Sequence, residues 1–304
     1  MRSDLTPPPQ ITAIVPSLCE ASRRASLMRA ISSLLEQSGA SVTPLVVVNG
    51  NRYDPGLLEE LNKRDDLNVL YREKGNLPAA VRAGREHVST PYFCFLDDDD
   101  EYLPGALSTR LAPMLRDSSV DVVVTNGYRS SDGKDTIVVS DFSIAQHAPL
   151  EGLLIQNWLA SCGGLYRTAA VPPSMFDPDF RYLEWTLTAF KLALEYNVVL
   201  LDTPTYRIFD SPQSLSKDPA YRFAGVKLID RILEFDMAPS VKRKLRIKKG
   251  RSLHGLSDHF LHQGDPTRAW KYHLASMTTP GGALQYGAYT RKLVALSLKV
   301  LFGS

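Results

Sequence analysis

The sequence predicts an α/β fold, in which helices flank a mostly parallel sheet and a helical appendage follows. Short apolar, β-branched segments alternate with segments of helical periodicity over residues 11–125. This order is typical of a parallel sheet covered on both faces. The segment 92–96 is apolar throughout and leads directly into four aspartates, as expected of a strand buried on both faces. After residue 218 only helical periodicity remains.

The elements of the first half follow from local patterns. Apolar runs predict strands at 11–16, 45–48, 67–71, 92–96 and 120–125. The first helix begins near Ser22, carries an apolar stripe at helical spacing, and is stopped by Gly39. Further helices are predicted at 55–63, 78–87 and 104–117, with Pro78 in a first turn, where a helix tolerates proline.

The second half changes character. A turn at 130–133 predicts strands on either side, and Gly163-Gly164 opens another short strand. We expect helices at 148–158 and 184–196, a loop at 175–181, and strands at 198–201 and 205–209. Beyond residue 218 we expect helices only, with a helical hairpin in which Asp265 caps and Pro266 opens the second helix.

Composition excludes some classes of protein. The 304 residues are 44% hydrophobic and 22% charged, with a net charge of +2, so charge gives no reason to expect a nucleic-acid partner. Three widely spaced cysteines, Cys19, Cys94 and Cys162, predict reduced thiols. Residues 1–10 lack the apolar core of a signal peptide, and no apolar stretch is long enough to span a bilayer. We therefore expect a cytoplasmic protein, either free or peripheral at the inner membrane face.

The four aspartates Asp97–Asp100 are the strongest candidate site. They follow a buried strand, and open α/β sheets bind ligands at the carboxyl ends of their strands. Oxygen ligands of this kind suit a hard divalent cation. The alternative is a solvated acidic turn. An EF-hand is excluded, because Tyr102 and Ser108 stand where that loop needs Gly and Glu.

Five segments together resemble glycosyltransferase family 2, whose members have the A-type glycosyltransferase fold. They are Ile11–Ser17, Leu45–Asn49, Gly75–Gly84, Phe95–Asp100 and Tyr182–Trp185. The resemblance covers residues 10–215. It implies a catalytic domain with a nucleotide-sugar half at 10–125 and an acceptor half at 126–215, followed by a helical region at 216–304.

The resemblance implies transfer of a sugar, with inversion, from a nucleotide diphosphate sugar to an acceptor hydroxyl, helped by Mn²⁺ or Mg²⁺. Asp97 and Asp99 form its Asp-X-Asp pair and would face one site if the segment is extended. Asp99 would bind the metal directly, and Asp97 through water or by holding the ribose. Asp98 and Asp100 would support the turn or the donor sugar. Asp210 would add a metal contact, with a turn role as the alternative.

Glu184 is the candidate general base that an acceptor hydroxyl needs. The family usually has a Glu-Asp pair before a Trp, whereas here Leu183 takes the first place and Glu184 directly precedes Trp185. The alternative is a charge favoured by the dipole at a helix N-terminus.

The resemblance places the nucleotide across the ends of the first two strands. Pro16 and Ser17 would lie behind the base, with Glu20 nearby, and Asn49 replaces the usual Asp. Arg82 would contact the diphosphate, with a solvated helix face as the alternative. Phe209 stands where many relatives have a His, and Ser214 and Ser216 would line a donor lid.

Other readings stay open. The replacements at Asn49, Leu183 and Phe209 leave room for a nucleotide-sugar-binding or scaffold protein without catalysis. A sugar nucleotidyltransferase is less favoured, because the loop 17–23 contains no glycine. The acceptor is a glycan, a lipid-linked molecule or a small molecule, and the oligomeric state is not determined.

Two segments leave membrane contact open. Residues 241–251 hold seven Lys or Arg, and residues 291–302 combine basic and apolar side chains. A solvated helix face is the default interpretation of the first segment, and attraction to anionic lipid head groups or to an anionic acceptor is the alternative. Docking on the core is favoured for the second. His254, His259 and His262 lack the spacing of a helical zinc site, and we expect them to be surface or packing residues.

Overall fold

The computed structural model describes residues 7–210 and 218–302, so Ser214 and Ser216 lie outside the described residues. The chain divides into two compact units, residues 1–212 and 213–304.

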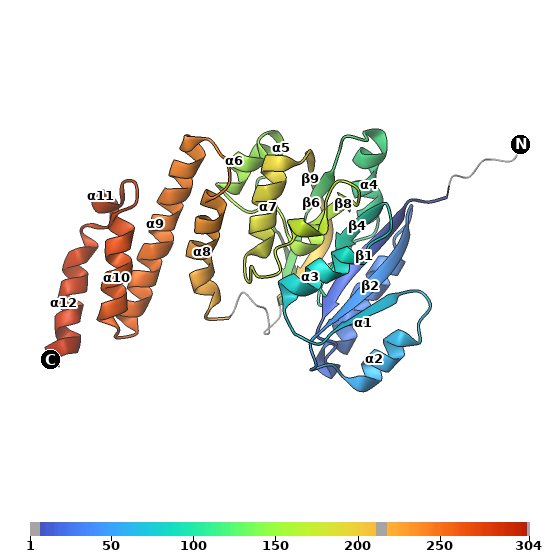
Figure 1. Cartoon of the computed structure of the whole chain (residues 1–304), viewed down its shortest axis with the longest axis horizontal. Coiled ribbons are helices and arrows are strands. Elements are labelled where there is room, and N and C mark those ends of the chain that lie inside the picture. The colour runs from blue at the N-terminus through green and yellow to red at the C-terminus, as the bar shows by residue number, and fades with distance from the viewer. Residues whose placement is uncertain (1–6, 211–217, 303–304) are drawn as a thin grey trace, which may run out of the picture. The chain divides into compact units, whose positions relative to one another are not determined.

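The first half of the N-terminal unit is a parallel sheet (Figure 1). Its strands are β1 (Gln10–Ser17), β2 (Ser41–Asn49), β3 (Asn68–Arg72) and β4 (Tyr92–Phe95), in the order β3-β2-β1-β4. The connections contain η1 (Ala21–Arg23), α1 (Arg24–Leu35), α2 (Pro55–Asn62) and α3 (Leu77–Glu86). The α/β alternation that the sequence predicts here is therefore confirmed.

The second half makes the sheet mixed rather than mostly parallel. Its elements are β5 (Glu101–Tyr102), α4 (Ala106–Arg116), β6 (Val122–Ser131), β7 (Lys134–Ile137), α5 (Ser143–His147), α6 (Pro149–Leu153), η2 (Ser161–Gly163), β8 (Gly164–Arg167), η3 (Pro173–Met175), α7 (Glu184–Glu195) and β9 (Val198–Phe209). β8 lies antiparallel between β4 and β6, and β9 then runs parallel to β6. The full order is β3-β2-β1-β4-β8-β6-β9-β5, with β7 paired to β6.

Two predicted elements are wrong. Of the helix expected at 148–158, only α6 (149–153) is present, and α5 precedes it as a separate helix. Ala148 between them is non-helical (φ −144°, ψ 81°), because the residue before a proline is pushed out of the helical region. The strands expected at 198–201 and 205–209 form one strand, β9. Its pairing with β6 shifts so that Leu201 and Pro204 face consecutive residues of β6, as in a β-bulge.

The two faces of the sheet bury different side chains, because successive residues of a strand point to opposite sides. Ile11, Ala13 and Val15 of β1 belong to a core cluster that includes apolar residues of α1, α2 and α4. On the opposite face, α3 packs so closely that a Cβ on Gly84 would lie 2.4 Å from Ile14 Cγ2. The carboxyl ends of β1 and β4 are thereby held side by side.

The C-terminal unit contains α8 (Tyr221–Leu233), α9 (Pro239–His262), α10 (Pro266–Met277), α11 (Gly282–Tyr286) and α12 (Tyr289–Phe302) (Figure 1). The predicted hairpin is confirmed, since the Asp265 carboxylate accepts from the Arg268 N–H at 2.9 Å. His254 stacks on Tyr286 with ring centroids 4.5 Å apart, as a packing residue. Among the described residues, no helix combines the length and the apolar character needed to cross a membrane.

Candidate active site

The four aspartates form a turn at the carboxyl end of β4. The strand is buried along its length, and the Leu96 N–H still donates to the Ile14 carbonyl of β1 at 3.0 Å. The chain then turns, and the Asp100 N–H donates to the Asp97 carbonyl at 3.1 Å. The expectation of an extended segment is therefore wrong here, and the four carboxylates point toward different partners.

Asp97 faces the second half of the unit. Its Oδ2 accepts a 2.6 Å hydrogen bond from Ser161 Oγ in η2. Burial, followed by the charge of Asp99, raises the pKa of Asp97 to about 7, and the charges of Asp98 and Glu184 act in the same direction. The surroundings of Asp97 therefore disfavour its ionised form and do not neutralise the charge that this form carries.

Asp98 is held from the end of β1. Ser17 Oγ donates to its Oδ2 at 2.5 Å, and the Arg23 guanidinium pairs with its Oδ1. Burial raises the pKa of Asp98, although the Arg23 charge lowers it. Asp98 thus ties the acidic turn to the loop that follows the first strand.

Asp99 and Asp100 connect the turn to other segments. Asp99 Oδ2 lies 3.3 Å from the Arg23 guanidinium, and Arg29 of α1 donates to the Asp99 backbone carbonyl at 2.6 Å. The Asp100 carboxylate accepts from the Phe209 N–H at 3.1 Å. Burial and the charges of its neighbours raise the Asp100 pKa well above its usual range.

Glu184 reaches the same site from the other half. It is the first residue of α7, after Tyr182 and Leu183, which both adopt the left-handed conformation (φ 64° and 55°). Non-glycine residues adopt this conformation at an energetic cost, which is commonly found at functional sites. Burial raises the pKa of Glu184, and its charge contributes to the raised pKa of Asp97, so the two carboxyl groups share one environment.

Trp185 fixes the start of α7. Its ring lies 5.0 Å from that of Phe95 and 6.1 Å from that of Phe176, both in edge-to-face arrangements. Phe95 is the last residue of β4. The same packing therefore positions the acidic turn and Glu184 relative to each other.

Of the residues expected to bind the nucleotide, Pro16 and Asn49 are buried at the ends of β1 and β2. The Asn49 side-chain oxygen Oδ1 accepts a hydrogen bond from the Asn76 backbone N–H at 2.8 Å. Asn76 in turn caps α3 by accepting from the Ala79 N–H. Asn49 thus holds the loop at the start of α3, a structural role that the sequence did not indicate.

Three predicted residues remain, and each has a contact of its own. Glu20 forms an ion pair with Arg52 at 3.3 Å. Arg82 pairs with Glu86 at 3.0 Å on α3, with 38% of its side chain exposed. Asp210 is exposed just after Phe209, and its N–H donates to the Ser130 carbonyl at 3.1 Å.

Sequence reasoning missed Arg23, Arg29 and Ser161. Arg23 follows β1 by six residues, and β1 and β4 are parallel neighbours, so the loop after β1 necessarily lies beside the aspartates. That adjacency was the available signal for Arg23. Ser161 had no such signal, because it depends on the antiparallel insertion of β8 next to β4.

The donor set fits a divalent cation. Within residues 7–210 and 218–302, no three His, Cys, Asp or Glu side chains are grouped as metal ligands. Mg²⁺ sites commonly use only one or two carboxylates and complete the shell with substrate phosphates and water. The repulsion that raises the Asp97 pKa is of the kind that a cation beside Asp97 and Asp99 relieves.

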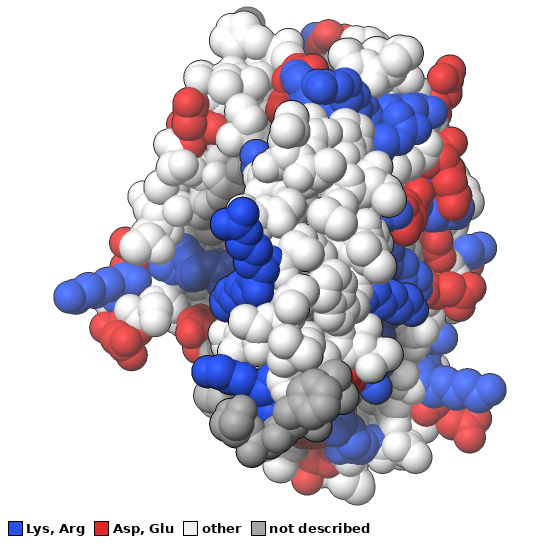
Figure 2. Space-filling view, turned by 90° about the vertical axis from the view of Figure 1, so that its left-hand side faces the viewer, with Lys and Arg blue, Asp and Glu red and all other residues white. Residues whose placement is uncertain are grey.

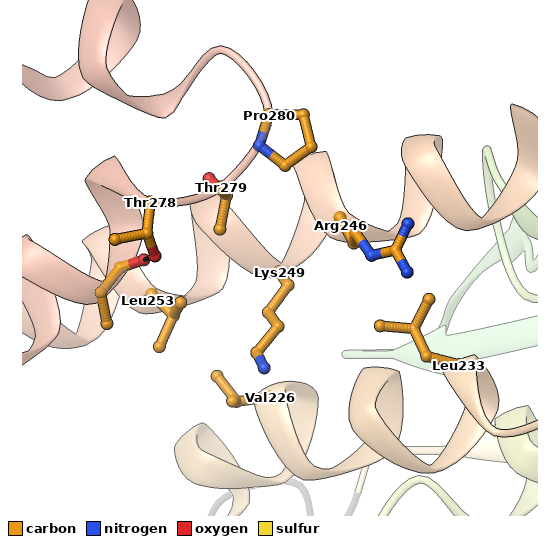
Figure 3. A pocket seen from close by; sticks show the side chains of 9 residues that line it. Val226, Leu233, Arg246, Lys249, Leu253, Thr278, Thr279 and Pro280 are labelled. Atoms are coloured by element: carbon orange, nitrogen blue, oxygen red, sulfur yellow. Dashed lines mark hydrogen bonds between the residues drawn. The ribbon is translucent and has the colours of Figure 1, made fainter. Parts of the chain in front are cut away.

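A separate hollow lies within the C-terminal unit (Figure 3). Its volume is about 340 Å³, and Arg246 and Lys249 of α9 lie beside the apolar side chains of Val226, Leu233 and Leu253. No carboxylate or imidazole lines it. Its described lining therefore lacks the carboxylate and imidazole groups that most often act as general bases or metal ligands.

Comparison with known proteins shows to which protein family the chain belongs. The glycosyl transferase family 2 model matches residues 12–170, the part of the chain that contains the acidic turn and the strands around it. The chain belongs to glycosyltransferase family 2, which confirms the family that the motifs predict.

Among its relatives is the uncharacterized glycosyltransferase EpsJ of Bacillus subtilis, 26% identical over 208 residues, which cover 62% of this chain and 58% of EpsJ. Another is the GalNAc(5)-diNAcBac-PP-undecaprenol beta-1,3-glucosyltransferase of Campylobacter jejuni, 33% identical over 108 residues, a third of each chain. The chain thus spans less than two thirds of the length of these relatives.

Solved structures confirm the fold. The S. aureus TarS 1–349 structure in complex with UDP-GlcNAc matches with a TM-score of 0.66 at 15% identity, over 97% of this chain and 92% of that one. The mannosyltransferase PcManGT of Pyrobaculum calidifontis, in complex with GDP-Man and Mn²⁺, matches with a TM-score of 0.55 at 16% identity, over 99% and 90%. The expected A-type fold with C-terminal helices is therefore confirmed.

Proposed function

We propose that the protein is an inverting, divalent-metal-dependent glycosyltransferase that moves a sugar from a nucleotide diphosphate sugar to an acceptor hydroxyl. One observation carries the proposal. Glu184 and Asp97 come from opposite halves of the unit, yet they are close enough for the charge of Glu184 to raise the Asp97 pKa. This supports a base and a cation site that would meet at the carboxyl edge of the sheet, where open α/β sheets bind ligands.

Asp99 and Asp97 would hold Mn²⁺ or Mg²⁺, which when bound neutralises the charge that develops on the diphosphate leaving group. Asp99 is our choice for the direct ligand, because among the described residues its carboxylate has only the Arg23 guanidinium as an ion-pair partner. Asp98 is occupied by Ser17 and Arg23, and Asp100 by the Phe209 N–H. These contacts support the view that Asp98 and Asp100 shape the turn, while Asp210 stays a weaker candidate ligand.

Glu184 would accept the proton of the acceptor hydroxyl as that oxygen attacks the anomeric carbon. The bond to the diphosphate breaks on the opposite side, so one transfer inverts the configuration. Burial, which raises the Glu184 pKa, brings a carboxylate closer to the range useful for a base at neutral pH. The Trp185 packing holds the base in place during the reaction.

The nucleotide would lie at the ends of β1 and β2, near Pro16, Ser17, Glu20 and Asn49. Residues 10–215 would form the catalytic domain, divided near residue 125 into donor and acceptor halves, and 216–304 a helical region. The name of the Campylobacter relative makes a lipid-linked acceptor the first class to test, ahead of other glycans. Three buried free cysteines favour the reducing cytoplasm.

The first experiment is a thermal-shift screen of nucleoside diphosphates and their sugars, with and without Mn²⁺. A ligand that binds only the native state raises the melting temperature by mass action. We expect one nucleotide class to raise it, and to do so with Mn²⁺ only. A chain that responds to none of them does not have the proposed donor site.

The second experiment separates catalysis from binding. With the donor that the screen identifies, Glu184→Gln should reduce transfer at least a hundredfold and keep Mn²⁺-dependent donor binding. Glu195→Gln, at the exposed far end of the same helix, is the matched control and should be unchanged. Native-rate transfer by Glu184→Gln would remove Glu184 as the base. A wild-type protein that binds donor without transfer to any acceptor class would be a scaffold.

A further inference from the structure

We propose that the C-terminal unit binds the surface of anionic phospholipid membranes through the outer face of α12. The inference is independent of the proposed catalytic function and concerns a different part of the chain. It rests on the distribution of charge, on the two faces of α12, and on cations that no carboxylate neutralises.

Charge is strongly segregated along the chain. Residues 213–304 contain 16 Lys and Arg against 6 Asp and Glu, a net charge of +10, whereas residues 1–212 contain 19 against 27, a net charge of −8. The overall charge of +2 hides this difference. Basic segments are attracted to the negative surface of a membrane that contains anionic lipid.

The inner face of α12 is packed. Leu293 has no exposed surface and belongs to a cluster with Phe260, Leu261 and Ala269. Ser297 Oγ accepts from Trp270 Nε1 at 3.2 Å. The sequence favoured docking of this segment on the rest of the protein, and the inner face of α12 does dock on its own unit. Because that face is packed, the opposite face of the helix points outward.

The outer face of α12 is apolar and bordered by cations. Val294 and Leu298 are 43% and 49% exposed, and a spacing of four puts them on one helical face. Arg291, Lys292 and Lys299 are also exposed. Figure 2 shows uncharged surface along the middle of this side, with Lys and Arg at its margins. Helices that lie in a membrane interface combine these two features.

The bordering cations are available to a partner. Lys292 lies 3.1 Å from Asp258, whereas within the described part of the chain Arg291 and Lys299 have no ion-pair partner. The charges of Arg291 and Lys299 can therefore act on an anionic surface that lies against this face, over the roughly 8 Å to which physiological salt limits their reach.

A second copy of the chain suits this face less well. Two units of net charge +10 repel each other when their outer faces meet, whereas an anionic bilayer supplies the opposite charge and an apolar layer for Val294 and Leu298. The structure therefore favours a lipid surface over self-association.

Vesicle co-sedimentation of the full chain tests the proposal. We expect at least tenfold stronger binding to vesicles with about 30% phosphatidylglycerol than to pure phosphatidylcholine, with most of it lost at high salt. Val294→Ser with Leu298→Ser should weaken binding about tenfold. Arg291→Gln with Lys299→Gln should weaken it about 25-fold, at about fivefold per charge.

Leu115→Ser with Ile155→Ser is the matched control, since these side chains of the N-terminal unit are 60% and 66% exposed. It should bind like the wild type, and thermal melts should show that all variants are folded. Equal binding to both vesicle types, no binding to either, or equal loss in control and α12 variants would overturn the proposal. So would sedimentation velocity showing a dimer that Val294→Ser with Leu298→Ser dissociates, without vesicle binding.

Discussion

Replacing Asp97 with asparagine should stabilise the metal-free protein at neutral pH, although it removes a candidate metal ligand. The carboxylate is surrounded by other acids, and burial together with Asp99 raises its pKa from 3.8 to about 7. Asparagine removes the charge and keeps an oxygen that can accept the hydrogen bond from Ser161.

The sign follows from proton linkage. Between pH 4 and 7 the folded protein holds a proton on Asp97 that the unfolded chain has released, so this group lowers the free energy of unfolding as pH rises. Its stabilising contribution is complete below pH 4 and lost above pH 7. A shift of about three pKa units corresponds to about 4 kcal/mol. Because Asp97 keeps some contact with water, we expect a gain of about 2–4 kcal/mol above pH 7.

The assay is urea unfolding in EDTA at pH 5, 6, 7 and 8, followed by tryptophan fluorescence. A Trp270→Phe background leaves Trp158 and Trp185, both in the N-terminal unit, so the signal reports that unit alone. Asp132→Asn, in the exposed turn between β6 and β7, is the control and should show no pH-dependent gain.

The advantage of Asp97→Asn should be less than half of its full size at pH 5 and grow up to pH 7–8, and saturating Mn²⁺ should reduce it. If Asp97→Asn destabilises the metal-free protein equally at every pH, Asp97 is not a strained charge, and the argument for a cation beside it fails.

Three further outcomes follow from the packing and electrostatics. Gly84→Ala should lower the free energy of unfolding in urea by about 1–3 kcal/mol through overpacking. Gly255→Ala, with no atom within 4 Å of the added Cβ, should be neutral or slightly stabilising. Equal effects of the two substitutions would contradict the close packing of α3. Arg23→Gln should cost about 2–3 kcal/mol at pH 8 and less in acid, because the raised pKa of Asp98 favours the neutral form of that partner as the pH falls. A pH-independent cost would argue against the ion pair. Burial raises the pKa of Cys19 and Cys94 to about 11. A thiol reagent at pH 8 should therefore modify no cysteine in the native protein and all three cysteines after unfolding. Rapid labelling of the native protein would show that these thiols are accessible.

The sequence was sufficient to predict the elements and residues whose positions depend only on neighbouring residues in the chain. An unbroken apolar strand predicted β4, and the aspartates after it necessarily lie at the carboxyl edge of the sheet. Asp265 and Pro266 predicted the start of α10 for the same reason. Glu184 came from a family motif, and the Trp185 packing now gives that motif a physical basis.

The sequence was insufficient to predict contacts that depend on the order of the strands in the sheet. Ser161 contacts Asp97 only because β8 inserts antiparallel between β4 and β6, and no local pattern encodes that insertion. The same applies to Arg29, which reaches the Asp99 carbonyl from a helix 70 residues earlier. The assumption that Asp97 and Asp99 share a face by strand alternation failed because the strand ends at Phe95 and the chain turns.

The central claim is that Asp99 and Asp97 hold a cation that binds the diphosphate of the donor. Calorimetric titration of the nucleoside diphosphate found in the thermal-shift screen, into wild type and Asp99→Asn with and without Mn²⁺, tests it most directly. We predict that Mn²⁺ tightens wild-type binding at least tenfold and leaves Asp99→Asn unchanged. Equal enhancement by Mn²⁺ in both proteins, or none in the wild type, would contradict the claim.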